Sequence, residues 1–445
     1  MLTTIQNALK TKEIRMKLLY VLFAMVIVRI GCNIPVPNVN NDIIQQLFNN
    51  NASLGFLDVM TGGSISRMSI FALNITPYIT ASIILQLLTI AIPRLEEMQK
   101  DGEDGRRKIN EYTRYLSIVL AVVEGGALVI GFRNQNLFRE NGIVAMVVAV
   151  VAMTAGAAFM MWLGEQITEK GVGNGISIVL LINIVARIPS DLSTLYKTFV
   201  APAGGNITNA IVAGAIILAI ILAMFTFIVW LQDGERRIPV QYAKKVQGRK
   251  VAGGQSSHIP LKVNTAGVIP VIFASSMMSL PVIIASFAGV QPQTGPEATV
   301  FQKLLTVCNQ SDWCKIGSWG EFKYTLGLLV YIVLIIFFAY FYTSVTFNPL
   351  EISNNMKKQG GFIPGIRPGK PTTDYLTNVL NSIVFIGAIG MVIACALPIF
   401  FSGAFNANVS FSGTSLIIIV GVIIETLKQI ESLVLVRHYK GFLGN

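Results

Sequence analysis

The sequence predicts an all-α polytopic membrane protein, and two observations carry this prediction. First, 53% of the 445 residues are hydrophobic and only 13% are charged, whereas a soluble domain has roughly 25% charged residues. Second, apolar runs recur along the whole chain, and many approach the roughly 20 residues that a helix needs to cross the hydrocarbon core of a bilayer. Most of the chain is therefore expected to lie in lipid.

Ten apolar segments account for this pattern, and each is predicted to be a transmembrane helix. They cover residues 17–34, 70–92, 115–132, 143–163, 176–188, 207–231, 263–290, 324–347, 375–401 and 412–436. The residues before the first segment are polar and basic, and no small-residue cleavage site follows it directly. We therefore expect the first segment to remain as a span and not to be removed as a signal peptide.

The basic residues indicate how the chain lies in the membrane. Most of the 34 Lys and Arg residues fall in alternate loops. Basic loops stay on the cytoplasmic side, so the two loops at about 232–262 and 348–373 are predicted to be cytoplasmic, together with both termini. The formal net charge of +11 is explained first by this orientation. The dense basic loop at 236–262 would also suit rRNA phosphates or an acidic partner.

Ten spans divide into two halves of five, residues 1–205 and 206–445. Because each half contains an odd number of spans, the two halves must have opposite orientations in the membrane. Inverted halves of this kind commonly place a transport path at their interface. The sequence shows no clear internal repeat, so this prediction depends on the number of spans alone.

Residues 55–67 are weakly apolar and contain Gly62 and Gly63, so they do not resemble a lipid-facing helix. Irregular backbone at membrane depth survives only where protein or water surrounds it. Two interpretations remain open for this segment. It is either a re-entrant segment within a cavity or an external loop.

No nucleotide, cofactor or metal site is expected. The segment GIRPGK at 365–370 has the wrong glycine spacing for a phosphate-binding loop, and Pro371 follows where Ser or Thr would hold magnesium. The segment GVGNG at 171–175 precedes a predicted span instead of following a strand. The four cysteines include no CxxC pair. Cys308 and Cys314 share a predicted external loop, where a disulfide and two free thiols both remain open.

Few ionisable residues fall within the predicted spans, the main ones being Arg29, Glu124 and Glu425. Such residues are candidates for function by default. A proton-coupled transporter would commonly need several of them near the middle of the membrane. Glu124 is the best candidate for such a site, so a secondary transporter of the inverted-repeat type is the alternative function.

Several motifs are specific enough to compare with known families. They are GGSISRMSIFAL (62–73), PYITASIILQLL (77–88), GRRKI (105–109), YTRY (112–115), WLGEQITEKGVGNGIS (162–177), YAKK (242–245), PLKVN (260–264), AGVIP (266–270), FNP (347–349) and FIPGIRPG (362–369). In these motifs and their order, the chain resembles the bacterial SecY family, the pore subunits of the Sec protein translocase. The resemblance covers nearly the whole chain, except for the predicted external loops after Phe132 and Ala288.

The resemblance implies a channel that passes unfolded preproteins across the bacterial plasma membrane and releases hydrophobic segments sideways into lipid. The implied fold has two inverted five-helix halves around a central pore, a lateral gate between the second and seventh spans, and a short re-entrant plug helix. The chain itself would not be an enzyme, because the SecA ATPase or the ribosome would drive transport. SecE and SecG are implied as partner subunits.

The resemblance also implies a pore ring, the constriction that grips a moving chain and limits ion leakage. Its six positions are Ile75, Ile79, Ile176, Leu180, Ile272 and Ile418. The first four form two pairs spaced four residues apart, so the members of each pair share a helix face. Leu180 departs from the isoleucine expected in the family.

Three further sets of site residues follow from the resemblance. The plug would be the segment at about 55–67, with Gly55, Gly62, Gly63 and Arg67. The lateral gate would carry Thr80, Gln86 and Asn264, which are able to hydrogen-bond across closed helices at about 0.6–2 kcal/mol each. Arg249 and Arg367 would contact SecA or the ribosome.

Overall fold

A computed structural model describes most of the chain. The described residues are 9–40, 61–133, 142–196, 207–242, 245–247, 250–252, 256–287, 290, 299–309, 313–314, 325–405 and 413–443.

Each predicted span contains a helix. These ten helices are α2 (Lys12–Gly31), α5 (Thr76–Ala91), α7 (Glu103–Arg133), α8 (Ile143–Lys170), α9 (Gly175–Leu195), α10 (Ile207–Asp233), α11 (Ile269–Phe287), α14 (Leu326–Thr346), α16 (Lys370–Phe405) and α17 (Gly413–Leu443). Three shorter helices lie between them: α6 (Pro93–Lys100), α12 (Val300–Cys308) and α15 (Pro349–Lys358). The chain is an all-α polytopic membrane protein.

Six segments of the described helices are long and apolar enough to cross a membrane by themselves. The bent pair Thr76–Thr89 and Pro93–Gln99, whose axes differ by 106°, is either a broken span, which would be the seventh, or a re-entrant loop. The bend falls at Ile92, which has extended backbone angles directly before Pro93. Proline disfavours the helical conformation in the residue that precedes it, so the sequence itself ends α5 at this point.

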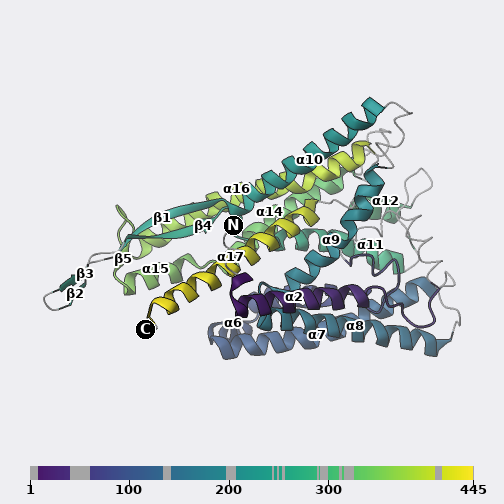
Figure 1. Cartoon of the computed structure of the whole chain (residues 1–445), viewed down its shortest axis with the longest axis horizontal. Coiled ribbons are helices and arrows are strands. Elements are labelled where there is room, and N and C mark those ends of the chain that lie inside the picture. Colours follow the sequence, from purple (N-terminus) through teal and green to yellow (C-terminus); the bar gives the residue numbers. More distant parts are fainter. Residues whose placement is uncertain are drawn as a thin grey trace.

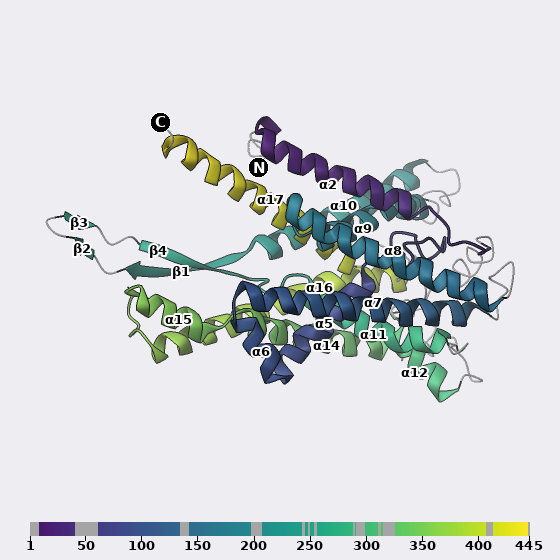
Figure 2. The same cartoon turned by 90° about the horizontal axis from the view of Figure 1, so that it is seen from below.

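The helices lie mainly along the long axis of the molecule (Figure 1). A strand hairpin projects beyond one end of the bundle, and α12 lies at the opposite end, in both views (Figure 1 and Figure 2). In Figure 1, α2, α6, α7 and α8 lie on one side and α10, α14 and α16 on the other, while α9 runs obliquely between them.

Two hydrophobic core clusters follow this arrangement. One contains residues of α10, α11, α14, α16 and α17, including the fully buried Ile228, Val271 and Ile335. The other contains residues of α2, α5, α8, α9 and α17, including the fully buried Val28 and Ile167. Helix α17 belongs to both clusters, so the last span joins the two groups of helices.

The basic loop at 232–262 forms a long antiparallel hairpin. Strand β1 (Glu235–Tyr242) pairs with β4 (Ser256–Lys262), and β2 (Lys245–Gln247) pairs with β3 (Lys250–Ala252) in the same continuous register. Strand β5 (Gly361–Phe362), from the other predicted cytoplasmic loop, adds to the free edge of β1.

Beneath the hairpin, Ile238, Val240 and Leu261 form a hydrophobic cluster with Met356 of α15 and Leu376 of α16. The two loops are therefore one packed unit, which we call the loop platform (residues 235–262 and 349–369).

Candidate functional site: an apolar constriction between the helix groups

The six predicted ring residues come together in one hydrophobic cluster. Ile75, Leu180 and Ile418 are buried members of it, with 1%, 7% and 1% of their surface exposed. Ile79, Ile176 and Ile272 are partly buried and pack against the same cluster. The four helices that carry them, α5, α9, α11 and α17, come from both ends of the chain. Their convergence makes an apolar cluster where the two helix groups meet.

Local sequence positions the two pairs from the first half. Ile75 occupies the N-cap position of α5, and the Ile79 N–H donates to the Ile75 carbonyl over 3.0 Å. The two residues therefore belong to the first turn of the helix. Asn174 caps α9 by accepting hydrogen bonds from the N–H groups of Ile176 and Ser177, at 3.1 and 3.4 Å. Asparagine is among the preferred residues for this cap.

Close backbone packing positions the residues from the second half. Gly413, which begins α17, lies against α16, where a β-carbon at this position would be 2.1 Å from the carbonyl oxygen of Ala394. Ile418 therefore lies just over one turn further along a helix that packs tightly on α16. In α11, the Ile272 N–H donates to the Val268 carbonyl over 3.3 Å, directly after Pro270.

The described part of the predicted plug, residues 61–67, lies beside this cluster. It forms turns and not helix, and residues 55–60, with Gly55, lie outside the described residues. Gly62 and Gly63 have φ angles of 67° and 85°, in a region that favours glycine. A β-carbon on Gly62 would lie 2.9 Å from the Cα atom of Asn183. Asn183 is one turn beyond Leu180 on α9.

Two arginines hold this segment. Arg29 donates from Nη1 to the carbonyl of Gly62 over 3.3 Å, and Arg67 donates from Nη1 to Oδ1 of Asn33. Both contacts join the plug segment to the end of α2. Arg29, a charged residue in a predicted span, is therefore explained by this contact.

The predicted gate residues form hydrogen bonds within their own elements. Thr80 donates to the Thr76 carbonyl over 3.1 Å, and Gln86 donates to Ser82 Oγ over 3.5 Å. Asn264 donates from Nδ2 to the Gly267 carbonyl over 2.9 Å. Among the described residues, the expected hydrogen bonds across the gate are not formed. Asn264 lies in the turn before α11 and not within the helix, because Gly267, with φ at 65°, turns the chain there.

Two amide side chains near these elements are buried and incompletely bonded. Asn264 is 3% exposed and Asn183 is fully buried. Oδ1 of Asn264 and Nδ2 of Asn183 have no hydrogen-bond partner among the described residues. A buried unpaired polar atom costs about 1–3 kcal/mol, so the structure carries this cost at both the gate and the plug.

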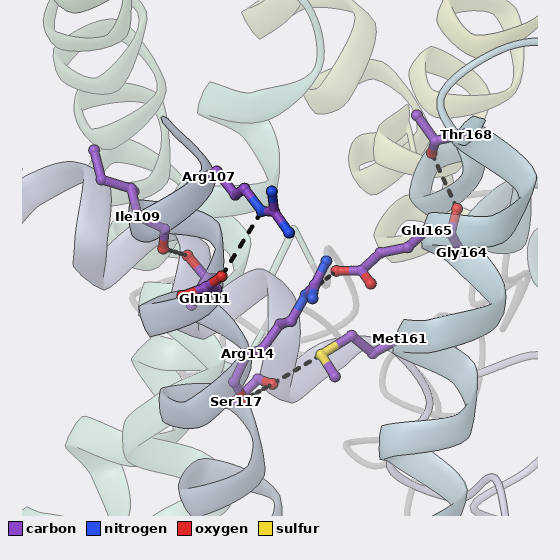
Figure 3. A network of polar contacts seen from close by, with 10 residues as sticks. Arg107, Ile109, Glu111, Arg114, Ser117, Met161, Gly164, Glu165 and Thr168 are labelled. Atoms are coloured by element: carbon purple, nitrogen blue, oxygen red, sulfur yellow. Dashed lines mark hydrogen bonds and ion pairs between the residues drawn. The ribbon is translucent and has the colours of Figure 1, made fainter. Parts of the chain in front are cut away.

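An ion pair joins α7 and α8 beside α5. Arg114 Nε donates to Glu165 Oε1 over 2.7 Å, and Ser117 donates to Met161 Sδ over 3.1 Å one turn away (Figure 3). Near Glu165 on α8, the Thr168 hydroxyl donates to the Gly164 carbonyl over 3.0 Å (Figure 3). These contacts hold α7 and α8 together as a unit.

The segment GVGNG at 171–175 connects α8 to α9 and contacts α17. The Gly173 N–H donates to Oε1 of Gln429, and Gly173 has a φ angle of 91°. Val172 is buried against Ile14 of α2 and Ile430 of α17. These glycines therefore join the two helix groups at a point away from α5 and α11.

Of the two predicted partner contacts, Arg367 is exposed on the loop platform. Its carbonyl accepts a 2.8 Å hydrogen bond from the Thr372 hydroxyl. Gly365 and Gly369, with φ angles of 84° and 107°, lie on either side of it and turn the chain. Arg249 lies outside the described residues, between β2 and β3.

Cys308 and Cys314 are free thiols in the structure. Burial raises the pKa of each thiol above its ordinary value.

Sequence reasoning missed Asn183, the Arg114–Glu165 pair and Gln429. Asn183 carried a usable signal, because a polar side chain within a predicted span commonly faces protein or a cavity. The other contacts join residues far apart in the chain, and nothing in a single sequence pairs them.

Helices of membrane-spanning length, packed in two groups around hydrophobic clusters, define a polytopic α-helical membrane protein. Comparison with known proteins is specific. The SecY family profile matches residues 69–427. The protein translocase subunit SecY of Streptomyces scabiei is 44% identical, and that of Halalkalibacterium halodurans is 41% identical, each over 100% of both chains. The chain belongs to the SecY family.

Solved structures share the fold. One described as a protein-conducting channel has a TM-score of 0.62 at 18% identity, covering 94% of this chain and 91% of that one. Sec61 in a canine ribosome–channel complex has a TM-score of 0.58 at 18% identity, with 94% and 91% coverage.

Proposed function

We propose that this chain is the pore-forming subunit of a protein-conducting channel in the bacterial plasma membrane. It passes unfolded preproteins across the membrane and releases hydrophobic segments sideways into lipid. The observation that carries this proposal is the cluster of six aliphatic side chains from α5, α9, α11 and α17. A channel for chains of varied sequence needs such a surface, because aliphatic groups offer passing peptides no fixed hydrogen-bond partner.

The same ring acts as a seal in the resting state. A narrow hydrophobic constriction obstructs ions by dewetting. The segment at 61–67 lies beside the ring and acts as the plug. The contacts of Arg29 with Gly62 and of Arg67 with Asn33 hold it there, and hydrogen bonds to charged groups contribute roughly 1.5–3 kcal/mol each. Thr61, Ser64 and Ile65 are also buried, so opening has to break both the hydrogen bonds and this packing.

The gate lies between α5 and α11. Separating these helices preserves the hydrogen bonds of Thr80, Gln86 and Asn264, since each is made within its own element. The unpaired Oδ1 of Asn264 and Nδ2 of Asn183 gain partners when water or a peptide enters. Both effects lower the free energy of opening.

The chain supplies no driving force of its own and acts without enzymatic activity. The loop platform, with Arg249 and Arg367, takes the SecA ATPase or the ribosome on the cytoplasmic side, where both termini also lie. Its basic residues suit acidic protein surfaces and rRNA phosphates. SecE and SecG complete the channel.

Purification of the tagged chain from native membranes tests this function. Two small membrane proteins should co-purify, and vesicles containing the complex should import a preprotein only when SecA and ATP are present. Vesicles that instead accumulate a small solute along an ion gradient, without protein import, would support the transporter alternative.

A further inference from the structure

Helix α12 (Val300–Cys308) has no part in the function above. It lies at the end of the bundle opposite the loop platform (Figure 1 and Figure 2), in the connection between the gate helix α11 and α14. Its first turn is closed by the Thr299 N–H, which donates to Gln302 Oε1 over 2.9 Å. The helix is therefore a defined element with its own cap.

One face of α12 is fixed against the bundle. Leu305 and Thr306 are fully buried. A β-carbon on Gly327, in the first turn of α14, would lie 1.9 Å from the Val307 carbonyl oxygen. That carbonyl also accepts a 2.8 Å hydrogen bond from Nε1 of the buried Trp313. Such close contacts leave α12 little freedom to rotate.

The opposite face carries large apolar side chains that the chain does not cover. Val300, Phe301 and Leu304 are 80%, 54% and 56% exposed. Leu304 follows Val300 by four residues and Phe301 by three, and residues at these spacings share a helix face, so the three side chains form one patch. Lys303 lies at its edge and is half-buried. An apolar face flanked by a basic residue is typical of helices that lie in a membrane surface.

The patch lies on a helix that packs against α14, and the outer face of α14 is also apolar and exposed. Along α14, Leu326, Leu329, Val333 and Phe337 are 58%, 60%, 63% and 58% exposed. This row faces the acyl chains, since α14 is one of the membrane-spanning helices. Leu326 is the neighbour of Gly327, on which α12 rests. The exposed apolar row of α14 thus begins at the turn against which α12 packs.

We propose that α12 is a membrane-interface anchor. Val300, Phe301 and Leu304 insert among the acyl chains of the leaflet opposite the loop platform, and Lys303 meets the lipid headgroups. Because α12 follows α11 and is locked to the first turn of α14, the anchor holds the far ends of both helices at the membrane surface. The bilayer surface thereby sets the depth of the gate helix.

The test uses the full chain with its co-purified subunits, in vesicles of phosphatidylcholine and phosphatidylglycerol. Phe301→Cys, Leu304→Cys and Lys303→Cys are made in a chain whose native cysteines are replaced by alanine, and each is labelled with an environment-sensitive fluorophore. Quenching by nitroxide on the lipid acyl chain is compared with quenching by iodide in the buffer. Val300→Cys replaces any variant that fails to assemble.

Labels at 301 and 304 should be quenched several-fold more by the lipid nitroxide than by iodide, and the label at 303 should show the reverse. Equal iodide quenching at all three positions would place the patch in water and overturn the proposal. Protection of 301 and 304 from both quenchers would mean that a protein covers the patch, which also overturns the lipid assignment.

Discussion

Gly62 packs so closely on Asn183 that a β-carbon at position 62 would lie 2.9 Å from the Asn183 Cα atom. Gly63, its neighbour, has a similar positive φ angle, but a β-carbon there would lie 3.7 Å from the nearest atom, at the end of Arg187. Comparing alanine substitutions at these two positions therefore distinguishes the effect of steric contact from the effect of backbone strain.

Gly62→Ala should displace the plug segment, because it adds both strain, of order 1–3 kcal/mol, and a clash with α9. The resting ion conductance of the reconstituted channel in planar bilayers should rise. Gly63→Ala carries the strain alone and should have a smaller effect. Equal conductance in both variants would argue against Asn183 as the seat of the plug.

Replacing Ile75, Ile272 and Ile418 together by serine should hydrate the constriction and raise resting conductance, while assembly with the partner subunits persists. The matched control is Ile386→Ser on the outer face of α16, where Ile386 is 59% exposed. Planar-bilayer recordings measure the difference. If the conductance equals that of the parent channel, these residues do not form the seal.

Arg367→Glu should sharply lower SecA-driven import into vesicles, because it reverses the charge of an exposed side chain on the loop platform. Insertion and subunit assembly should be unchanged. Lys358→Glu, an exposed position on α15, makes the same charge change away from the turn at 365–369. If both variants lose import equally, the loss is caused by the changed net charge of the loop platform and not by the loss of a specific contact of Arg367.

The orientation of the chain predicts which positions are accessible from outside the cell. Cysteine at Gly248 should react with an impermeant thiol reagent only after the membrane is broken, since the basic hairpin is cytoplasmic by the positive-inside rule. Cysteine at Lys303 should react in intact cells. Labelling at 248 in intact cells would reverse the topology.

Gly173→Ala and Gln429→Ala should both weaken the junction between the α8–α9 turn and α17. A β-carbon on Gly173 would lie 2.9 Å from Ile178 and 3.0 Å from Thr426, in addition to the positive φ. Each change should lower the free energy of unfolding by about 1–3 kcal/mol, measured by denaturant titration of the purified complex. Gln429→Glu keeps an acceptor for the Gly173 N–H and should stay near the parent. Gly214→Ala, where a β-carbon meets nothing within 4 Å, controls for the glycine change.

The sequence was sufficient for the positions of the helices and less so for their ends. Apolar runs located all ten, but α7 begins at Glu103, well before the predicted span at 115. Glu, Arg and Lys are good helix formers outside lipid, and hydropathy does not report that. The basic loop was expected to be either flexible or hairpin-like, and the structure shows paired strands. The added strand β5 was not expected, because a strand as short as Gly361–Phe362 leaves no periodic signal.

The ring shows a different limit. Spacing alone paired Ile75 with Ile79 and Ile176 with Leu180, but an aliphatic residue in a span ordinarily packs or faces lipid. Only the family resemblance singled out these positions, and only the structure placed them in one cluster. For Asn264 the sequence suggested too much. Its polar side chain predicted a hydrogen bond across the gate, whereas in the structure it donates to the Gly267 carbonyl within the same turn.

Very few residues connect the hairpin to the membrane-spanning helices at its base. Gly234 alone separates α10 from β1, and its carbonyl accepts a 2.8 Å hydrogen bond from the Val263 N–H at the end of β4. Asn264 and Gly267 follow directly and lead into α11. The paired strands β1 and β4 thus lead into α10 and α11 through connections of only a few residues. A displacement of these strands is therefore passed on to the ends of both helices.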